Sequence, residues 1–265
     1  MKITVLIENK ETSSFICEHG LSLLIETDNK KILFDTGSTD KFLLNAQKLN
    51  MDLSDIDFVC LSHAHYDHTG GLLTFIKETN YTNKIYVGNS FNNNKYKFEN
   101  NKYSYLGTPF KTNEIKNLIF VNKLITINNV YLMNNFTQNN DFEKVDSKFF
   151  VLNGNYEKDI FTDELVLAID SNNGLILIVG CAHVGICNII DETIKRLNKK
   201  VKAVIGGFHL SKKNIDDVLK TIDYLKKYNL EFISPLHCSG NEDIFTKTFE
   251  DKCKILKSGD SLIFN

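Results

Sequence analysis

Four residues of metal-binding type lie within six positions, directly after the apolar run 57–61: His63, His65, Asp67 and His68. Side chains two residues apart on an extended backbone point the same way, so His63 and His65 can bind one ion together. Asp67 and His68, at the turn into a following helix, can face a second ion. Imidazole and carboxylate suit zinc, and also iron or manganese. The segment therefore predicts two divalent metal ions, Zn²⁺ in the first place and Mn²⁺ or Fe²⁺ as alternatives. A solvated histidine-rich loop is disfavoured by the buried strand before it.

Three later histidines are also candidates for the site. His183 and His237 directly follow apolar runs, and rigid strands would hold them as a metal ligand requires. Histidines that complete the core are the alternative. His209 follows Gly206-Gly207-Phe208 and precedes a helix start. Three roles are open for it: a metal ligand, a substrate contact or an acid catalyst. We predict that His183 and His237 bind metal and that His209 acts mainly on the substrate.

Other polar residues near these motifs have two interpretations each. Asp35, before Thr36-Gly37, is either a turn former or a group that orients a ligand histidine, which we prefer. Cys181 is either a thiolate ligand or, as is commoner, a buried and inert cysteine. Glu18 and His19 belong either to the mouth of the site or to a surface turn.

The motif His63-x-His65-x-Asp67-His68, followed by Gly70-Gly71, resembles the signature of the metallo-β-lactamase superfamily. Phe34-Asp35-Thr36-Gly37 resembles an earlier aspartate motif of the same superfamily. Further segments resemble a prokaryotic subgroup that is often labelled as similar to the dihydropterin–ribofuranosylaminobenzene phosphate synthase of methanopterin biosynthesis. These segments are Glu18-His19-Gly20-Leu21-Ser22, Gly180-Cys181-Ala182-His183-x-Gly185, Gly206-Gly207-Phe208-His209 and Pro235-Leu236-His237-Cys238.

The resemblance implies an α/β fold, an αββα sandwich with metals at one edge between the two sheets. It implies that His63, His65 and a later histidine hold the first metal, and that Asp67, His68 and His237 hold the second. In the wider family a further aspartate bridges the two metals at a strand end in the second half. Here the run 175–179 ends in Gly180-Cys181-Ala182-His183 instead, which leaves the bridging ligand open.

Alternating and helical periodicities predict the elements that must position these residues. One domain is expected over 1–265, with an insertion or lid around 89–140 that is rich in Asn, Lys, Tyr and Phe. Its aromatic residues either stack on a flat ring such as a pterin or pack a small core of their own: Phe91, Tyr96, Phe98, Tyr103, Tyr105 and Phe110. Strands are expected at 2–8, 21–26, 31–35, 57–61, 85–87, 118–121, 124–133, 165–169, 175–179, 201–205, 232–236 and 261–264. Helices are expected at 39–49, 71–78, 186–197, 215–228 and 241–249.

Composition narrows the function classes. The 265 residues are 42% hydrophobic and 24% charged, with a net charge of −2, so no global field attracts nucleic acid or an anionic membrane. No run approaches a membrane span and no signal-peptide pattern follows Met1, so a cytoplasmic location is expected. The six cysteines form no C-x-x-C pair and are expected to be reduced. The predicted partner is a small-molecule substrate; the oligomeric state is left open.

The chemistry expected is that of a metal-dependent hydrolase or transferase. A bound metal lowers the pKa of its water to about 7 and so supplies a nucleophile at neutral pH. Asp67 would be mainly a ligand that can also accept a proton, and His209 would steady charge or protonate the leaving oxygen. The subgroup resemblance favours a phosphate-ester or pyrophosphate substrate. A lactone or thioester hydrolase is the alternative on the same dinuclear site. A diiron redox or sensing protein is a further alternative, although such proteins usually carry a flavin domain.

Overall fold

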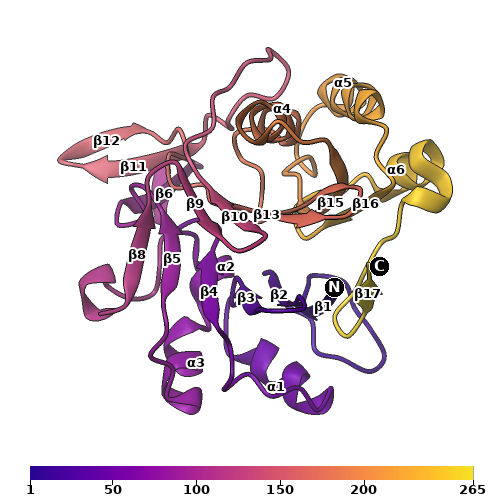
Figure 1. The fold of residues 1–265 in the computed structure, drawn as a ribbon. Coiled ribbons are helices and arrows are strands. Elements are labelled where there is room, and N and C mark those ends of the chain that lie inside the picture. Colours follow the sequence, from indigo (N-terminus) through magenta and orange to yellow (C-terminus); the bar gives the residue numbers. More distant parts are fainter. Residues whose placement is uncertain (265) are drawn as a thin grey trace.

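Two β-sheets face each other and helices cover their outer faces (Figure 1). The structure is a computed structural model and describes residues 1–264. The predicted αββα sandwich is confirmed, with the first sheet from the N-terminal half and the second from the C-terminal half. The C-terminal strand β17 (Ser261–Ile263) returns to pair with β1 (Lys2–Ile7), so the two ends of the chain lie together.

The first sheet has seven strands in the order β17-β1-β2-β3-β4-β5-β8. Its remaining strands are β2 (Ser22–Glu26), β3 (Lys31–Phe34), β4 (Phe58–Leu61), β5 (Ile85–Gly88) and β8 (Leu118–Val121). Strands β3, β4, β5 and β8 are parallel. Every residue of β4 is buried, as expected for a parallel strand covered on both faces.

The second sheet has six strands in the order β16-β15-β14-β13-β10-β9. These are β9 (Leu124–Ile127), β10 (Val130–Met133), β13 (Val166–Ser171), β14 (Gly174–Val179), β15 (Val201–Gly207) and β16 (Phe232–Leu236). Strands β14, β15 and β16 are parallel, so their carboxyl ends lie at the same edge.

Three hydrophobic cores hold the layers together. One lies between the two sheets, where residues such as Phe34, Leu167 and Ile178 are fully buried. The second joins the first sheet to α1 (Lys41–Lys48) and α3 (Leu72–Thr79). The third joins the second sheet to α4 (Ile186–Leu197), α5 (Ile215–Leu225) and α6 (Glu242–Phe249). The short helix α2 (Tyr66–Thr69) and the 3-10 turns η1 (Thr112–Glu114), η2 (Lys226–Tyr228) and η3 (Glu250–Lys252) complete the chain.

The expected 89–140 segment is not one insertion. Strand β8 joins the first sheet, and the expected strand 124–133 is a hairpin, β9–β10, at the edge of the second sheet. The additional structure is a small sheet in the order β12-β11-β6-β7. It combines β6 (Asn94–Glu99) and β7 (Lys102–Tyr105) with β11 (Phe149–Asn153) and β12 (Asn155–Lys158). Strand β12 carries no apolar run, and β11 has only the four apolar residues 149–152. The sheet forms only because β11 pairs with β6 across more than 40 residues of chain.

The aromatic residues of this small sheet pack mainly against one another. Tyr103 stacks on Tyr156 with ring centroids 3.6 Å apart, and Tyr96 meets Tyr105 edge-on at 5.4 Å. This contact pattern favours the expectation of a small separate core over that of a ring-binding surface.

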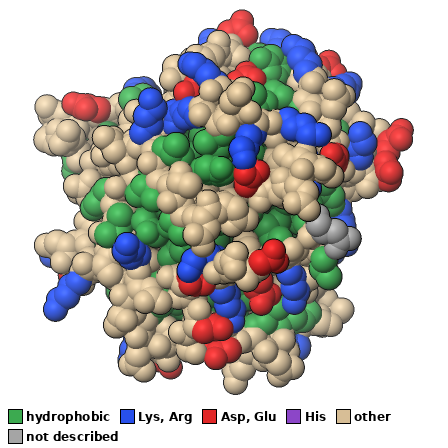
Figure 2. Space-filling view, viewed as in Figure 1, with side chains coloured by type: hydrophobic (Ala, Val, Ile, Leu, Met, Phe, Trp, Pro, Cys, Tyr) green, Lys and Arg blue, Asp and Glu red, His purple; other side chains and the backbone are tan. Residues whose placement is uncertain are grey.

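The surface carries no large field of one sign on the face drawn in Figure 2, where acidic and basic side chains are interspersed. This agrees with the net charge of −2. None of the helices within residues 1–264 combines the length and apolar character needed to cross a membrane.

Candidate metal centre

The residues singled out in the sequence lie at the carboxyl ends of parallel strands. Asp35 directly follows β3, and His63 comes two residues after β4. Cys181, His209 and His237 follow β14, β15 and β16 in the same way. Because the two parallel sets end at the same edge of the sandwich, loops far apart in the chain meet there. The fold thus gathers this site from both halves.

All seven histidines of the chain belong to one cluster. Their rings form a connected set in which each ring centroid lies within 4.9 Å of another: His19–His237 4.9 Å, His237–His68 4.9 Å, His68–His63 4.3 Å, His63–His65 4.5 Å, His63–His183 4.8 Å and His183–His209 4.3 Å. A chance distribution of histidines would not converge in this way, and the cluster is therefore the candidate functional centre.

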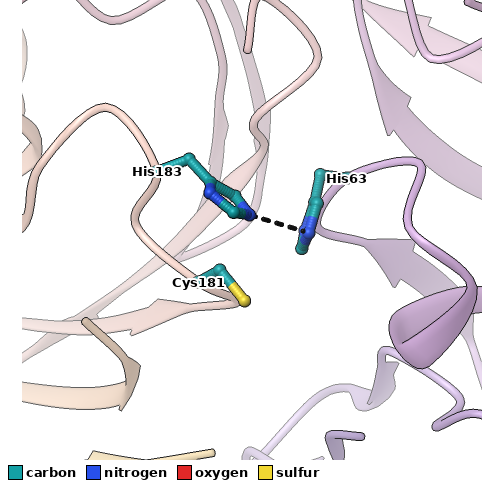
Figure 3. Close-up of side chains that lie close together, drawn as sticks. All are labelled: His63, Cys181 and His183. Carbon is teal, nitrogen blue, oxygen red and sulfur yellow. Dashed lines mark hydrogen bonds between the residues drawn. The ribbon is translucent and has the colours of Figure 1, made fainter. Parts of the chain in front are cut away.

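One group of candidate ligands joins the two halves of the fold. His63 from the first half and His183 from the second point their Nε2 atoms at each other across 3.3 Å, and the Cys181 side chain points into the same gap (Figure 3). Two nitrogen ligands of a tetrahedral Zn²⁺, each 2.0–2.1 Å from the ion, lie about 3.3 Å apart. The buried Nε2 of His65 has no hydrogen-bond partner among the described residues, although its ring packs 4.5 Å from that of His63. Both observations fit a transition-metal ion.

A second group surrounds Asp67. Its Oδ2 lies 3.1 Å from His19 Nε2, 3.3 Å from His237 Nε2 and 3.9 Å from His68 Nε2. His68 Nε2 is in turn 3.2 Å from Cys181 Sγ. The carboxylate thus collects three imidazoles from separate segments, a donor set that suits a second divalent ion. For His19 the sequence left two interpretations, the mouth of the site or a surface turn. The contact of its Nε2 with Asp67 places His19 at the site.

Asp35 lies beneath the centre and holds His68. Its Oδ2 is 2.6 Å from His68 Nδ1, and both side chains are fully buried. The same carboxylate accepts hydrogen bonds from the backbone N–H and the hydroxyl of Ser62, each at 2.7 Å. The Ser62 hydroxyl is also 3.0 Å from His63 Nδ1. Asp35 and Ser62 therefore fix ring orientations on the side away from the gap, as outer groups of metal sites do.

Three further groups that sequence patterns did not indicate position the C-terminal ligands. Asn9 Oδ1 lies 2.8 Å from His237 Nδ1, and Glu8 accepts the backbone N–H of His237 at 2.7 Å. Glu164 accepts the backbone N–H groups of His183 and Val184 at 2.7 and 2.9 Å. Glu8 and Asn9 follow β1 at the same sheet edge, and only this strand-end position in the sequence could have suggested them.

A buried lysine also supports the centre. Lys95 Nζ lies 2.7 Å from Asp159 and 2.5 Å from Asp163, and the lysine is only 2% exposed. Asp163 Oδ2 accepts the backbone N–H of Ala64, which lies between the candidate ligands His63 and His65, at 2.9 Å. Lys95 also lies over the ring of Phe161, which stacks on His183 at 3.8 Å. The small sheet is thereby tied to both metal-binding loops.

His209 occupies a different position from the other late histidines. Its ring packs 4.3 Å from His183 and 5.6 Å from Phe149, and its buried Nδ1 has no partner in the described chain. Its backbone N–H donates to Cys238 Sγ at 3.3 Å. His209 supplies a donor atom to one candidate group of metal ligands, together with Cys181 and Cys238. It lies at one end of the histidine cluster, next to His183, and lines the cavity, within reach of a bound molecule.

Burial and charge divide the titratable groups into two kinds. Burial lowers the pKa of His63, His65 and His183 well below the usual range, so these rings are neutral and offer a lone pair. Burial opposes ionisation of Asp67, but His68 and the other imidazoles outweigh it and hold the pKa of Asp67 well below its usual range. His68 differs from these three: burial lowers its pKa, but the Asp35 and Asp67 carboxylates outweigh burial and raise the pKa of His68 above its usual value. The His63, His65 and His183 rings and the Asp67 carboxylate are thus in the protonation states in which such groups bind metals.

Several strand ends turn through left-handed backbone. Asp35, Ala182, His209 and His237 have φ angles of 58°, 51°, 50° and 51°. Non-glycine residues rarely adopt such angles, at a cost of about 1–3 kcal/mol each. The sharp turns aim side chains at the gap directly after the strands. Gly180 serves close packing instead, because a Cβ there would lie 2.1 Å from Ser62 Oγ.

A cavity of about 410 Å³ opens over the cluster. His65, Asp67, His183, His209 and His237 form its floor. Lys10, Lys97, Lys148 and Lys212 stand around it, with Tyr66, Leu106 and Phe149 as its apolar wall. None of the six aromatic residues expected to bind a flat ring lines this cavity. Tyr66, which is 39% exposed, and the buried Phe149 line it instead.

Comparisons with known proteins agree with this architecture. A model of the metallo-beta-lactamase superfamily matches residues 16–183. The 7,8-dihydropterin-6-methyl-4-(beta-D-ribofuranosyl)-aminobenzene-5'-phosphate synthase of Methanocaldococcus jannaschii is 33% identical, over 100% of this chain and 97% of its own length. The crystal structure of Tm1679, described as a metal-dependent hydrolase of the beta-lactamase superfamily, is 33% identical and superposes with a TM-score of 0.87, covering 100% of this chain and 99% of Tm1679. A diphosphatase of the PhnP family, 13% identical with a TM-score of 0.55 over 100% of this chain and 98% of its own, shares the fold.

Proposed function

Because the chain belongs to the metallo-β-lactamase superfamily, we propose that it is a metal-dependent hydrolase or transferase acting on a small molecule that carries a phosphate ester or pyrophosphate. The fold of this family implies divalent metal binding, and the full-length relative from M. jannaschii is an enzyme. The observation that carries the proposal is the cavity itself, in which a histidine floor is surrounded by four lysines.

The lysines around the cavity support an anionic substrate. Lys97 and Lys148 come from the small sheet or the turn before it, and Lys212 from the loop after His209. Lys212 has no carboxylate within 4.0 Å in the described part of the chain, so its charge is free for a ligand. Lys10 is paired with Glu242 at 2.6 Å, Lys97 with Glu99 and Lys148 with Asp146, so these three lysines contribute less than Lys212. Positive charge at a concave mouth attracts and orients phosphate groups.

The apolar wall supports a substrate with a flat or hydrophobic part. Tyr66 and Leu106 are joined by a backbone hydrogen bond of 2.9 Å and form one side of the cavity with Phe149. An anionic group near the lysines and a ring near Tyr66 would place the scissile bond over the histidine floor. A pterin phosphate, the class named for the M. jannaschii relative, has both features.

Two divalent metal ions, Zn²⁺ in the first place, would be held by His63, His65 and His183 on one side and by Asp67, His68 and His237 on the other. When bound, they supply Lewis acidity and lower the pKa of a water molecule. The protein's part is positional: Asp35 orients His68, Asn9 orients His237, and Asp67 can accept a proton. His209, which also lines the cavity, donates a proton to the leaving oxygen or stabilises its charge.

Metal content provides the first test. We expect close to two equivalents of transition metal per chain after reconstitution and gel filtration, because six candidate ligands form two groups. Elemental analysis of the metal-replete protein measures this directly. A reproducible content of zero would overturn the enzyme assignment.

Substrate class provides the second test. Bis(p-nitrophenyl) phosphate and a pterin pyrophosphate should be turned over, whereas lactones and thioesters should not. Lys212→Ala should raise KM for the anionic substrate by roughly fivefold with little change in kcat, since exposed ion pairs are worth at most about 1 kcal/mol. Lys102→Ala, on β7 and outside the cavity, is the matched control. Turnover of only the lactone or thioester would instead favour the alternative hydrolase.

A further inference from the structure

We infer that the Cys181 thiolate is a metal ligand shared between the two halves of the centre. The inference deepens the proposed function, since it assumes the metal centre described above. It assigns a ligand from the second half of the chain at a point where no carboxylate is present.

The position of Cys181 carries the argument. Its Sγ belongs to three of the four candidate ligand groups in the described chain: with His63 and His183, with His68 and His237, and with His209 and Cys238. In each group the donor atoms lie within 4.8 Å of one another. The sulfur is 3.2 Å from His68 Nε2, and the residue is only 3% exposed. Among the described residues, Cys181 is the one member that the candidate group of His63 and His183 shares with the candidate group of His68 and His237.

Charge balance points the same way. Two divalent ions bring four positive charges, but Asp67 is the only carboxylate in the four groups. The nearby acids of the second half are engaged elsewhere: Asp163 binds Lys95 and Glu164 accepts the backbone of His183. When Cys181 binds, its S–H proton leaves to solvent as the metal–sulfur bond forms, and the thiolate supplies a second negative charge.

A sulfur ligand also bears on metal identity. Thiolate is a soft ligand that suits Zn²⁺ or Fe²⁺ better than Mn²⁺, which prefers oxygen. The centre should therefore take up Zn²⁺ or Co²⁺ in preference to Mn²⁺.

Cys238 is the matched control because it lies beside the centre without joining its halves. It occurs in one candidate group only, and its Sγ contacts the carbonyl oxygen of Cys181 at 3.8 Å. The two thiols are thus neighbours, but only Cys181 belongs to the candidate groups of both His63 and His68.

The experiment is cobalt substitution of the whole protein, read by absorption and metal content. The Co²⁺ form should show a near-ultraviolet sulfur-to-cobalt charge-transfer band that persists in Cys238→Ala and disappears in Cys181→Ala and Cys181→Ser. Cys181→Ala should bind at least one of the two ions about 100-fold more weakly, no less than the loss seen when a group behind a ligand is removed. Cys181→Asp should restore two equivalents without the band. Circular dichroism of each variant verifies folding.

Absence of the band in the wild-type protein loaded with two cobalt ions would overturn the inference. So would a band that survives in folded Cys181→Ala or Cys181→Ser, or one that is lost in Cys238→Ala alone. None of these readouts depends on turnover. A protein with the band and two metals but no activity on phosphate esters would therefore contradict the proposed substrate class and leave the Cys181 assignment standing.

Discussion

His183→Ala and His237→Ala are each expected to lose bound metal and activity together, with kcat/KM falling by at least about 10²–10³-fold. His183 Nε2 faces His63 Nε2 at 3.3 Å, and His237 Nε2 faces the Asp67 carboxylate at 3.3 Å. Each substitution would remove a donor from a different group, so each should reduce metal content after gentle dialysis. Elemental analysis measures the metal content of the two variants and the wild-type protein, and steady-state kinetics on the same samples measures their kcat/KM.

His209→Ala is the comparison variant for this prediction. It should keep both metals and lower kcat by about 10²-fold, the usual cost of removing a general acid. The reason is its place at one end of the cluster, next to His183, with a buried Nδ1 that has no partner among residues 1–264. If His209→Ala loses as much metal as His183→Ala, then His209 is itself a ligand and the division between ligands and substrate-facing histidine is wrong.

Lys95→Met should destabilise the protein by about 3–5 kcal/mol, because it leaves two buried carboxylates without their counter-charge. Lys95 is 2% exposed and lies within 2.7 Å of both Asp159 and Asp163. For a chain of this size the loss corresponds to a fall in Tm of roughly 10 °C. Metal affinity should fall as well, since Asp163 holds the backbone of Ala64 and Lys95 packs on Phe161 beneath His183.

Lys102→Met tests whether the effect belongs to the buried cluster. Lys102 is an exposed lysine on β7, which pairs with β6, the strand that carries Lys95. Its replacement should change the free energy of unfolding by no more than about 0.5 kcal/mol. Urea unfolding of the metal-replete proteins compares the two. Equal stabilities for the Lys95 and Lys102 variants would show that the buried ion cluster contributes nothing net to folding.

Much of the fold could be predicted from local patterns. The expected helix 186–197 and the strand 232–236 coincide with α4 and β16, because an amphipathic period and a buried apolar run are properties of contiguous residues. Boundaries moved by one to three residues elsewhere; β15, for example, continues through Gly206-Gly207. The hairpin within 124–133 was missed because Asn128-Asn129, although a turn signal, interrupts what reads as one apolar run.

The small sheet could not be predicted in the same way. Strand β12 is exposed throughout, so no burial pattern marks it. Strand β11 pairs with β6, which ends at Glu99, whereas β11 begins only at Phe149. Register in such a sheet depends on contacts between distant segments. Lys95 illustrates this: in the sequence it is one lysine in a polar stretch, and only the fold buries it against Asp159 and Asp163.

The sequence by itself determined the superfamily motifs and the set of candidate histidines, because these depend on residue types at short spacings. The resemblance carried by those motifs implied the αββα class. The tertiary structure alone decided which donors face one another. His19 and Cys181 are 162 residues apart in number, yet the loops that bear them meet at one sheet edge beside Asp67 and His68. Distances between atoms at strand ends follow from the pairing of distant strands and from the packing of the two layers, with left-handed turns such as those at His209 and His237 aiming the side chains. Strand pairing and layer packing join residues far apart in the chain, so short sequence patterns do not reveal them.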